Sequence, residues 1–246
     1  MSGHSKWSNI KHKKASQDTK RGKIFTQLIR EITMAVHQGG PDSNMNPRLR
    51  IAISNALNKN MKKDGIERAI QRVMGSEKNV ALEEVRYEGY GPLGIAFIVD
   101  CITNNRNRSI AEIRHAFSQL GINLGNTGSV CYMFRQKGII SFEADSNEGK
   151  IMEVALEAGA KDVVVNSDKS ISVITDSNQF IEIKKAFERQ SFDILSAQIT
   201  LESDIKVPVI EDVLAEKVLR VIHSLKDLKD AHQVYSNAYF GSQKYK

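Results

Sequence analysis

Cations interleaved with one tryptophan occur near the start of the chain. The sequence reads KWSNIKHKK over residues 6–14 and KRGK over residues 20–23. Lysine ammonium groups can neutralise phosphates, and an indole can stack on an unpaired base. This chemistry favours nucleic-acid binding over a merely solvated tail. The residues expected to make the contacts are Lys6, Trp7, Lys11, His12, Lys13, Lys14, Lys20, Arg21 and Lys23.

Trp7 supports two interpretations. Its ring either stacks on a base, or packs against the helices that follow and anchors the basic segment. The chain contains no second tryptophan. Both interpretations remain open from the sequence.

A second candidate for anion binding is NNRNR, residues 104–108, where an expected strand passes into a helix. The guanidinium groups of Arg106 and Arg108, together with backbone N–H groups at a helix start, suit an anionic ligand. Asparagine-rich segments are equally typical of turns and helix caps. The two interpretations stay open side by side.

Two glycine-rich segments carry weaker signals. EGYGPLG, residues 88–94, includes Tyr90 and follows Tyr87, and these rings offer a stacking surface. Tight hairpin geometry explains that segment better. GINLGNTGS, residues 121–129, matches neither GxGxxG after a strand nor GxxxxGK[ST], which disfavours nucleotide binding.

Residues for catalysis or metal binding show no recognisable spacing. HExxH, GxSxG and DxDxDG motifs do not occur, and the six histidines are scattered along the chain. Cys101 and Cys131 form no CxxC pair, which argues against a zinc site or a disulfide framework. We expect a protein that is not an enzyme, with no cofactor, no metal and no small-molecule substrate.

The charge is distributed unevenly. The whole chain carries +6, from 35 Lys and Arg against 29 Asp and Glu. Residues 1–78 hold 16 cations against 6 acids, or +10, and the remaining residues hold 19 against 23, or −4. A basic block joined to a mildly acidic body is typical of a polyanion-binding protein.

Hydropathy argues against a membrane protein. No stretch approaches the roughly 18 consecutive apolar residues of a membrane helix, and the first residues lack the apolar region of a secretory signal. We expect a soluble, cytoplasmic protein without a membrane partner, and the sequence leaves its oligomeric state open.

Helical periodicity dominates the first third of the chain. Apolar residues recur at helical spacing over residues 23–37, 47–60 and 64–74. Helices of this length bury their apolar stripes only against one another. We therefore predict a first domain, residues 1–78, in which a mobile basic arm precedes a three-helix bundle.

The period then changes to that of strands and helices in alternation. Strands are expected at 83–90, 94–103 and 130–134, with a helix that opens at Ser109 and ends near Gly121. Residues 138–204 follow a β-α-β-β-α-β order. Its elements are strand 139–143, helix 147–158, strands 162–166 and 170–175, helix 177–190 and strand 193–202. This order is that of the split βαβ, or ferredoxin-like, arrangement.

The last elements are a helix at 211–225 and a strand at 231–236. They supply the helix and strand that the unit at 83–134 lacks. The predicted fold is thus a multi-domain α+β protein. Its second domain comprises residues 79–134 and 205–246, and residues 135–204 form an inserted ferredoxin-like domain.

Ordered motifs along nearly the whole chain resemble the YebC/PmpR family. They include GHSKWSNIKHKKASQDTKRGKIFTQLIREI, NPRLRIAISNALNKNM, YEGYGPLG, NNRNRSIAEIRHAF, GNTGSVCYMF, KGIISFE, MEVALEAGAKDV and HQVYSNAYF. The family's acidic run before the closing VY-x-N is here interrupted by lysines and His232. The resemblance implies a helical N-terminal domain, two α+β domains and a bacterial cytoplasmic protein.

For function, the resemblance implies a DNA-binding transcriptional regulator. The family is also similar to a mitochondrial translational activator of cytochrome oxidase subunit 1. Some bacterial members are associated with ribosomes and with relief of stalling. The alternative is therefore a ribosome-associated translation factor that binds RNA. No expected helix carries Arg, Asn or Gln at base-reading spacing, which argues against site-specific DNA reading.

Overall fold

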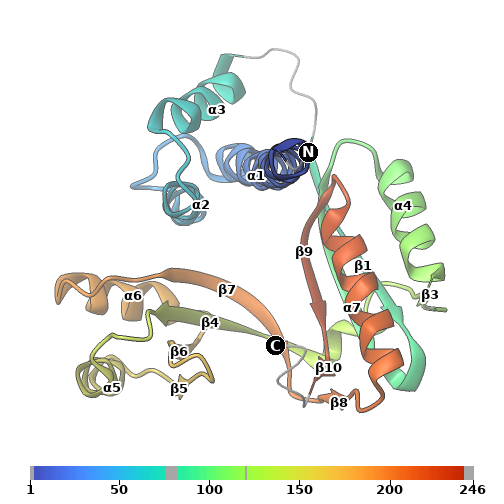
Figure 1. The fold of residues 1–246 in the computed structure, drawn as a ribbon. Helices are drawn as coiled ribbons and strands as arrows, with labels where there is room; N and C mark the ends of the chain where they lie inside the picture. The colour runs from blue at the N-terminus through green and yellow to red at the C-terminus, as the bar shows by residue number, and fades with distance from the viewer. Residues whose placement is uncertain (1–2, 76–81, 120, 241–246) are drawn as a thin grey trace. The chain divides into compact units, whose positions relative to one another are not determined.

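The computed structural model describes residues 3–75, 82–119 and 121–240, with side chains described from residue 21 onward. The chain divides into two compact units, residues 1–83 and 84–246. The protein has an α+β fold whose sheets contain mostly antiparallel strands (Figure 1). None of the described helices combines the length and apolar character needed to cross a membrane.

Three helices form the first unit. They are α1 (Gly3–Gly39), α2 (Pro47–Asn58) and α3 (Lys63–Gly75). Their apolar stripes meet in a core that includes Ile32, Val36, Leu49, Ala56 and Ile66. The sequence predicted three helices here from the same stripes.

The start of the first helix differs from the prediction. The sequence predicted a mobile arm before residue 23, whereas α1 begins at Gly3. Residues 3–22 contain no proline, and five of them are lysines, which favour helix. The apolar stripe that begins at Ile24 therefore does not mark the start of the helix.

Asn46 determines the path from α1 to α2. Its side-chain oxygen accepts the N–H of Leu49 at 3.0 Å, which caps α2, and its amide nitrogen donates to the carbonyls of Ala35 and Gly40. Only 3% of Asn46 is exposed, and Cβ at Gly39 would lie 2.7 Å from its side chain. The two helices are thus joined by a buried polar contact.

One sheet of the second unit has the strand order β3-β1-β2-β9. These strands are β1 (Glu83–Tyr90), β2 (Ala96–Thr103), β3 (Asn123–Leu124) and β9 (Ala231–Ser236). Helices α4 (Arg106–Ser118) and α7 (Asp212–Asp227) lie side by side along it (Figure 1). Phe97, Phe117, Val218 and Leu225 contribute to their shared core.

The predicted strand at 130–134 is wrong for most of its length. Residues Cys131–Met133 form the 3₁₀ helix η2, and β4 (Phe134–Phe142) begins only afterwards. The N–H groups of Val130 and Cys131 donate to the Glu88 carboxylate, so they are not available to a neighbouring strand. The short strand β3, within the glycine-rich segment, pairs with β1 instead.

A second sheet has the order β5-β6-β4-β7, with each neighbouring pair antiparallel. After β4 come α5 (Glu148–Glu157), β5 (Asp162–Val165), β6 (Ile171–Asp176), α6 (Phe180–Arg189) and β7 (Ser196–Ser203). The sequence predicted this succession of elements. Phe142 on β4 packs against Phe187 on α6, with ring centroids 4.9 Å apart.

The two sheets differ in which parts of the chain supply their strands. The second sheet is built from residues 134–203 alone, whereas β9 returns to pair with β2, for example Ile98 with Tyr235. Two short elements not predicted, β8 (Val207–Pro208) and β10 (Ala238–Tyr239), form a parallel pair. The division of this unit into separate domains stays a prediction.

Candidate nucleic-acid interface

Most of the predicted contact residues lie on the first half of α1. Lys6, Trp7, Lys11, His12, Lys13, Lys14 and Lys20 all fall between Gly3 and Gly39. Their side chains lie outside the described part of the structure. Their positions on a helix are nevertheless fixed by spacing: 6, 13 and 20 repeat every seven residues, and 7, 11 and 14 follow four- and three-residue steps.

Arg21 and Lys23 belong to the same basic segment, and the structure describes their side chains. Arg21 is exposed, and its guanidinium carbon lies 5.2 Å from the ring centroid of Phe25. A cation over an aromatic face is held in place while its outer side remains accessible. Lys23 is half-buried. The guanidinium of Arg21 is therefore a positioned and accessible positive charge at the C-terminal end of this basic segment.

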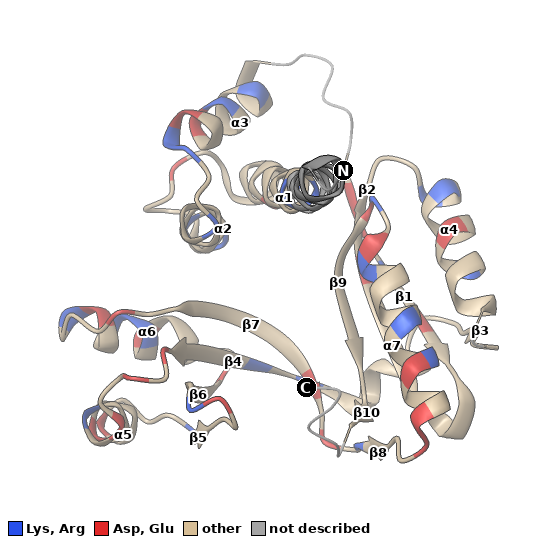
Figure 2. Cartoon of the chain, viewed as in Figure 1, with Lys and Arg blue, Asp and Glu red and all other residues tan. Residues whose placement is uncertain are grey.

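Three lysines that were not predicted as contact residues lie where α2 ends and α3 begins, and we call Lys59, Lys62 and Lys63 the lysine turn. Lys59, Lys62 and Lys63 are exposed, and none of their ammonium groups has a partner among the described residues. Asn60 adopts the left-handed conformation, with φ of 58°, and Met61 is buried in the helical core. The buried side chain of Met61 thus anchors the turn, and the three lysines are exposed to solvent. Figure 2 shows a cationic start of α3.

Other arginines of the helical unit have structural roles. Arg48 forms a two-pronged ion pair with Glu31, with N–O distances of 2.8 and 3.0 Å. Arg50 donates to the carbonyls of Ser43 and Asn44. These arginines hold the α1–α2 connection. The signal for the lysine turn was available in the sequence, as three lysines within five residues where one helix ends and the next begins.

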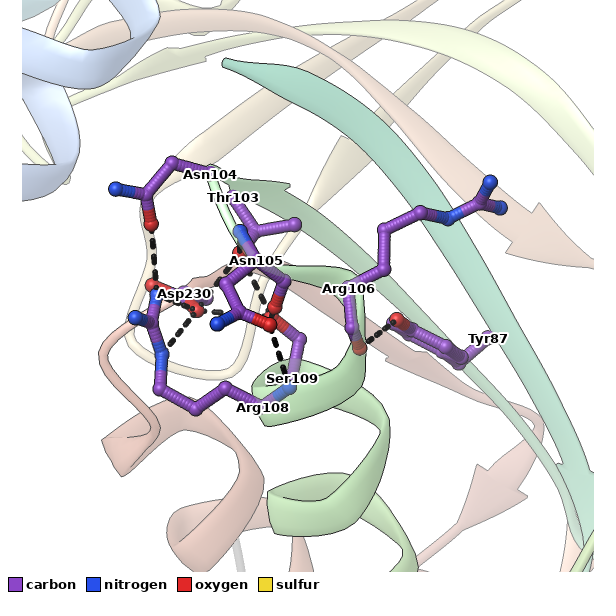
Figure 3. Close-up of polar contacts among 8 residues, drawn as sticks. All are labelled: Tyr87, Thr103, Asn104, Asn105, Arg106, Arg108, Ser109 and Asp230. Atoms are coloured by element: carbon purple, nitrogen blue, oxygen red, sulfur yellow. Dashed lines mark hydrogen bonds and ion pairs between the residues drawn. The ribbon is translucent and has the colours of Figure 1, made fainter. Parts of the chain in front are cut away.

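The NNRNR segment is a helix cap joined to a buried carboxylate (Figure 3). Helix α4 begins at Arg106 and not at Ser109, because the Asn105 side chain accepts the N–H of Arg108 at 3.0 Å. The capping interpretation is therefore realised by Asn105. Ser109 is turned inward, and its hydroxyl donates to Asp230 at 2.8 Å.

Asp230 forms an ion pair with Arg108. The Nη2 atom of Arg108 lies 2.6 Å from Asp230 Oδ2, and this hydrogen bond raises the pKa of Arg108. Asp230 is only 2% exposed and also accepts the hydroxyl of Thr103. Arg106 differs, because its side chain is exposed and points away from this cluster in Figure 3. Of the two predicted arginines, Arg108 is therefore held by an ion pair with Asp230, and Arg106 extends into solvent.

Glu88 organises the segment GNTGSVC from 40 residues away. Its carboxylate accepts N–H groups from Gly128 at 2.8 Å, Val130 at 2.8 Å and Cys131 at 2.9 Å, while its side chain is buried. Burial alone would raise the pKa of Glu88. The three N–H donors and the charge of Arg86 outweigh burial, so that this pKa lies below its usual value.

Tyr90 brings the two glycine-rich segments together. Its hydroxyl donates to the carbonyl of Ser129 at 2.7 Å and lies 3.1 Å from the hydroxyl of Tyr132. The hydrogen bond with Tyr132, together with burial, raises the pKa of Tyr90 to about 12. Tyr132 itself is 69% exposed, whereas Tyr87 is buried in the core. Local sequence patterns do not indicate these contacts, because they join residues 39 and 42 positions apart.

No metal site occurs within the described ranges, since no three His, Cys, Asp or Glu side chains group there in a way that could hold an ion. The described groups that are accessible to a ligand are of two other kinds. They consist of accessible cations in the helical unit and an accessible ring in the second unit.

Comparisons with known proteins match the chain almost end to end. A family model described as the TACO1/YebC protein N-terminal domain matches residues 5–76, and one described as the TACO1/YebC second and third domain matches residues 82–238. "Probable transcriptional regulatory protein" is the name of relatives in Francisella tularensis subsp. tularensis and subsp. novicida. Each is 53% identical over 240 residues, which cover 98% of this chain and 96% of the relative.

The fold also has a match among solved structures. A crystal structure of a conserved hypothetical protein from Aquifex aeolicus superposes with a TM-score of 0.84. The two sequences are 39% identical, and the match covers 92% of this chain and 93% of the other.

Proposed function

The chain belongs to the TACO1/YebC family, and we propose that it is a non-enzymatic regulatory protein that binds nucleic acid, acting as a DNA-binding transcriptional regulator in the cytoplasm. Its relatives bear the name of probable transcriptional regulatory proteins. The observation that carries the proposal is the concentration of positive charge, +10, in residues 1–78.

Helical spacing along α1 supports phosphate contacts. Lys6, Lys13 and Lys20 repeat every seven residues along one face of the helix, and Lys11 and Lys14 fall roughly a third of a turn away from that face. A helix with lysines on two faces can contact phosphates on two sides, and each neutralised phosphate releases counterions. Trp7 falls on the same face as Lys11 and Lys14, and stacking and anchoring both stay open for it.

The lysine turn between α2 and α3 supports the same function. Lys59, Lys62 and Lys63 are exposed cations without partners among the described side chains. Folding stability gains little from such residues, and the buried Met61 fixes the turn that carries them. Among the arginines at the start of α4, Arg106 is the more exposed and is the better candidate for a ligand contact.

The test replaces Lys11, Lys13 and Lys14 with Ala. Affinity for duplex DNA should fall, and the slope of log affinity against log salt should flatten by up to about three units. A matched control removes three exposed lysines from α5, α6 and α7, namely Lys150, Lys185 and Lys217. Both variants lose the same net charge, so that only a localised interface separates them. An unchanged slope in the first variant would remove the basic segment from the interface.

RNA binding and ribosome co-sedimentation, measured at the same salt concentration, address the translational alternative. A chain that sediments with ribosomes and does not bind DNA would overturn the transcriptional proposal. Trp7 emission provides a further readout, because it is the only indole in the chain. Quenching by DNA or RNA would indicate stacking, and an emission indifferent to nucleic acid would indicate an anchor.

We also infer that residues 135–204 form a ferredoxin-like domain inserted into a domain made of residues 79–134 and 205–246. The strand order β5-β6-β4-β7 and the pairing of β9 with β2 support this division.

A further inference from the structure

Two glycine-rich segments meet beside an exposed phenol ring on the second unit. Tyr90, from EGYGPLG, bonds both Ser129 and Tyr132, from GNTGSVCY. Leu93, in the first segment, is 70% exposed, and Tyr132, in the second segment, is 69% exposed. Asn126 and Thr127 are exposed on the same loop as Ser129. We call Leu93, Asn126, Thr127 and Tyr132 the tyrosine site.

The backbone that carries this site is held firmly. The Glu88 carboxylate accepts three N–H groups of residues 128–131, and the carbonyl of Glu88 accepts the N–H of Gly125 at 2.8 Å. A Cβ at Gly125 would collide with the Ser129 hydroxyl. A buried carboxylate that binds three backbone donors fixes the loop before any ligand arrives, which lowers the entropic cost of binding.

Leu93 is held in an uncommon conformation. Its φ is 58°, in the left-handed region, within the 3₁₀ helix η1 (Pro92–Gly94). Hydrogen bonds between Gly91 and Ile95, and between Ile95 and Pro92, close this turn around it. Such strain persists only where the surrounding structure imposes it, and it occurs preferentially at binding sites. Here it accompanies a large apolar side chain that remains in solvent.

The chemistry of the site suits a nucleobase. The phenol ring of Tyr132 offers a face for stacking, and the side chains of Asn126 and Thr127 each offer donor and acceptor groups for base edges. Residues 121–134, GINLGNTGSVCYMF, contain no charged side chain. This loop therefore offers no cation to a phosphate, but it offers an uncharged surface to an aromatic base.

We propose that the tyrosine site binds an unpaired base of single-stranded nucleic acid by stacking on Tyr132. The proposal rests on the proposed nucleic-acid-binding function and adds a second, uncharged contact to it. A base within a duplex is stacked on its neighbours and cannot present its face to the ring. The site is therefore selective for unpaired strands, whether these come from RNA or from locally melted DNA.

The test compares Tyr132→Ala with the unsubstituted chain, using oligouridine RNA, oligothymidine DNA and a DNA duplex. Loss of one stacked base should weaken binding to the single strands by about 5-fold to about 150-fold. Duplex binding and the salt slope should not change, because no charge is removed. The two single strands show whether the source is RNA, DNA or both.

Two matched variants separate stacking from structure. Tyr132→Phe removes the hydroxyl contact with Tyr90 but keeps the ring, so that its single-strand affinity should stay within about twofold of the unsubstituted chain. Tyr239→Ala removes another exposed tyrosine, on β10, and should have no effect. Iodouridine in the RNA should crosslink on irradiation to the peptide that contains Tyr132, without any substitution in the protein.

Each outcome is decisive. Equal single-strand affinity for Tyr132→Ala and the unsubstituted chain, with no crosslink to residues 125–134, overturns the tyrosine site. It does not affect the proposed lysine contacts of the first unit. An equal loss on single strands and duplex also overturns it, since stacking cannot act on paired bases. If the unsubstituted chain binds no nucleic acid at all, the proposed function fails, and the tyrosine site fails with it.

Discussion

Replacing Glu88 with Gln is expected to destabilise the second unit by about 2–4 kcal/mol at neutral pH. In the native chain, Oε1 accepts the N–H of Gly128, and Oε2 accepts those of Val130 and Cys131. A glutamine amide has only one oxygen, so that at least one N–H faces an NH₂ group and loses its acceptor, at about 1–3 kcal/mol. The bonds that remain lose their ionic character, which costs about 1 kcal/mol more.

The pH dependence gives this prediction a definite sign. The pKa of Glu88 lies below its usual value in the folded chain, because the N–H donors outweigh burial. The stabilisation is therefore fully present above the unfolded pKa of about 4.3 and is lost as the pH falls through the lowered pKa. The difference between the native chain and Glu88→Gln should be constant from neutral pH to about pH 5.5 and shrink on further acidification.

Urea unfolding followed by circular dichroism measures the difference in unfolding free energy at each pH. Hydrogen exchange at the amides of Gly128, Val130 and Cys131 reads the same loss locally. Glu153→Gln, at an exposed position on α5, is the matched control and should change stability by less than about 0.5 kcal/mol. The reasoning is refuted if Glu88→Gln matches this control, or if its deficit grows as the pH falls.

Two further predictions concern the architecture. Asp230→Ala should cost about 2–3 kcal/mol in a urea melt, because the buried hydroxyls of Thr103 and Ser109 lose an acceptor. Arg108→Ala should also be destabilising, because it leaves the buried Asp230 carboxylate without its cation, and a variant as stable as the native chain would contradict this account. A fragment of residues 134–204 should melt cooperatively by itself, because its sheet is complete. A fragment of residues 80–134 should not fold, because it lacks β9, and its cooperative melting would argue against the inserted domain.

Elements governed by local patterns were predictable from the sequence. Strands β1 and β9 occupy the predicted residues, and α2, α3, α5, α6 and α7 begin and end within a few residues of the predicted limits. Periodic apolar residues and turn residues specify such elements without reference to distant parts of the chain. The succession of elements in the second sheet followed for the same reason.

Elements governed by distant partners were not predictable. Val130 and Cys131 look like strand residues, but the carboxylate that takes their N–H groups lies more than 40 positions earlier in the chain. The start of α4 was misplaced because Asn105 and Ser109 are both residues that favour helix caps. Only contact with Asp230, over 120 positions away, shows that Ser109 is used elsewhere.

The candidate contacts divide in the same way. The basic segment and the lysine turn are local sequence features, although the exposure of Lys59, Lys62 and Lys63 follows from the burial of Met61. The tyrosine site depends on a contact between Tyr90 and Tyr132, and neither of its two glycine-rich segments suggests the other. Spacing within each segment favoured a plain hairpin and a plain loop.

The two proposed kinds of contact obey different physical rules, and together they constrain what the protein can distinguish. Counterion release favours the duplex, because its charge is denser and its salt slope per contact is steeper than that of a single strand. Lysines alone therefore provide no preference for unpaired strands. A preference for single strands requires an uncharged surface that only an unpaired base can reach, and among the described side chains Tyr132 has the exposure and the rigid support for that role. Selectivity between strands would thus come from the unit that carries no excess of positive charge.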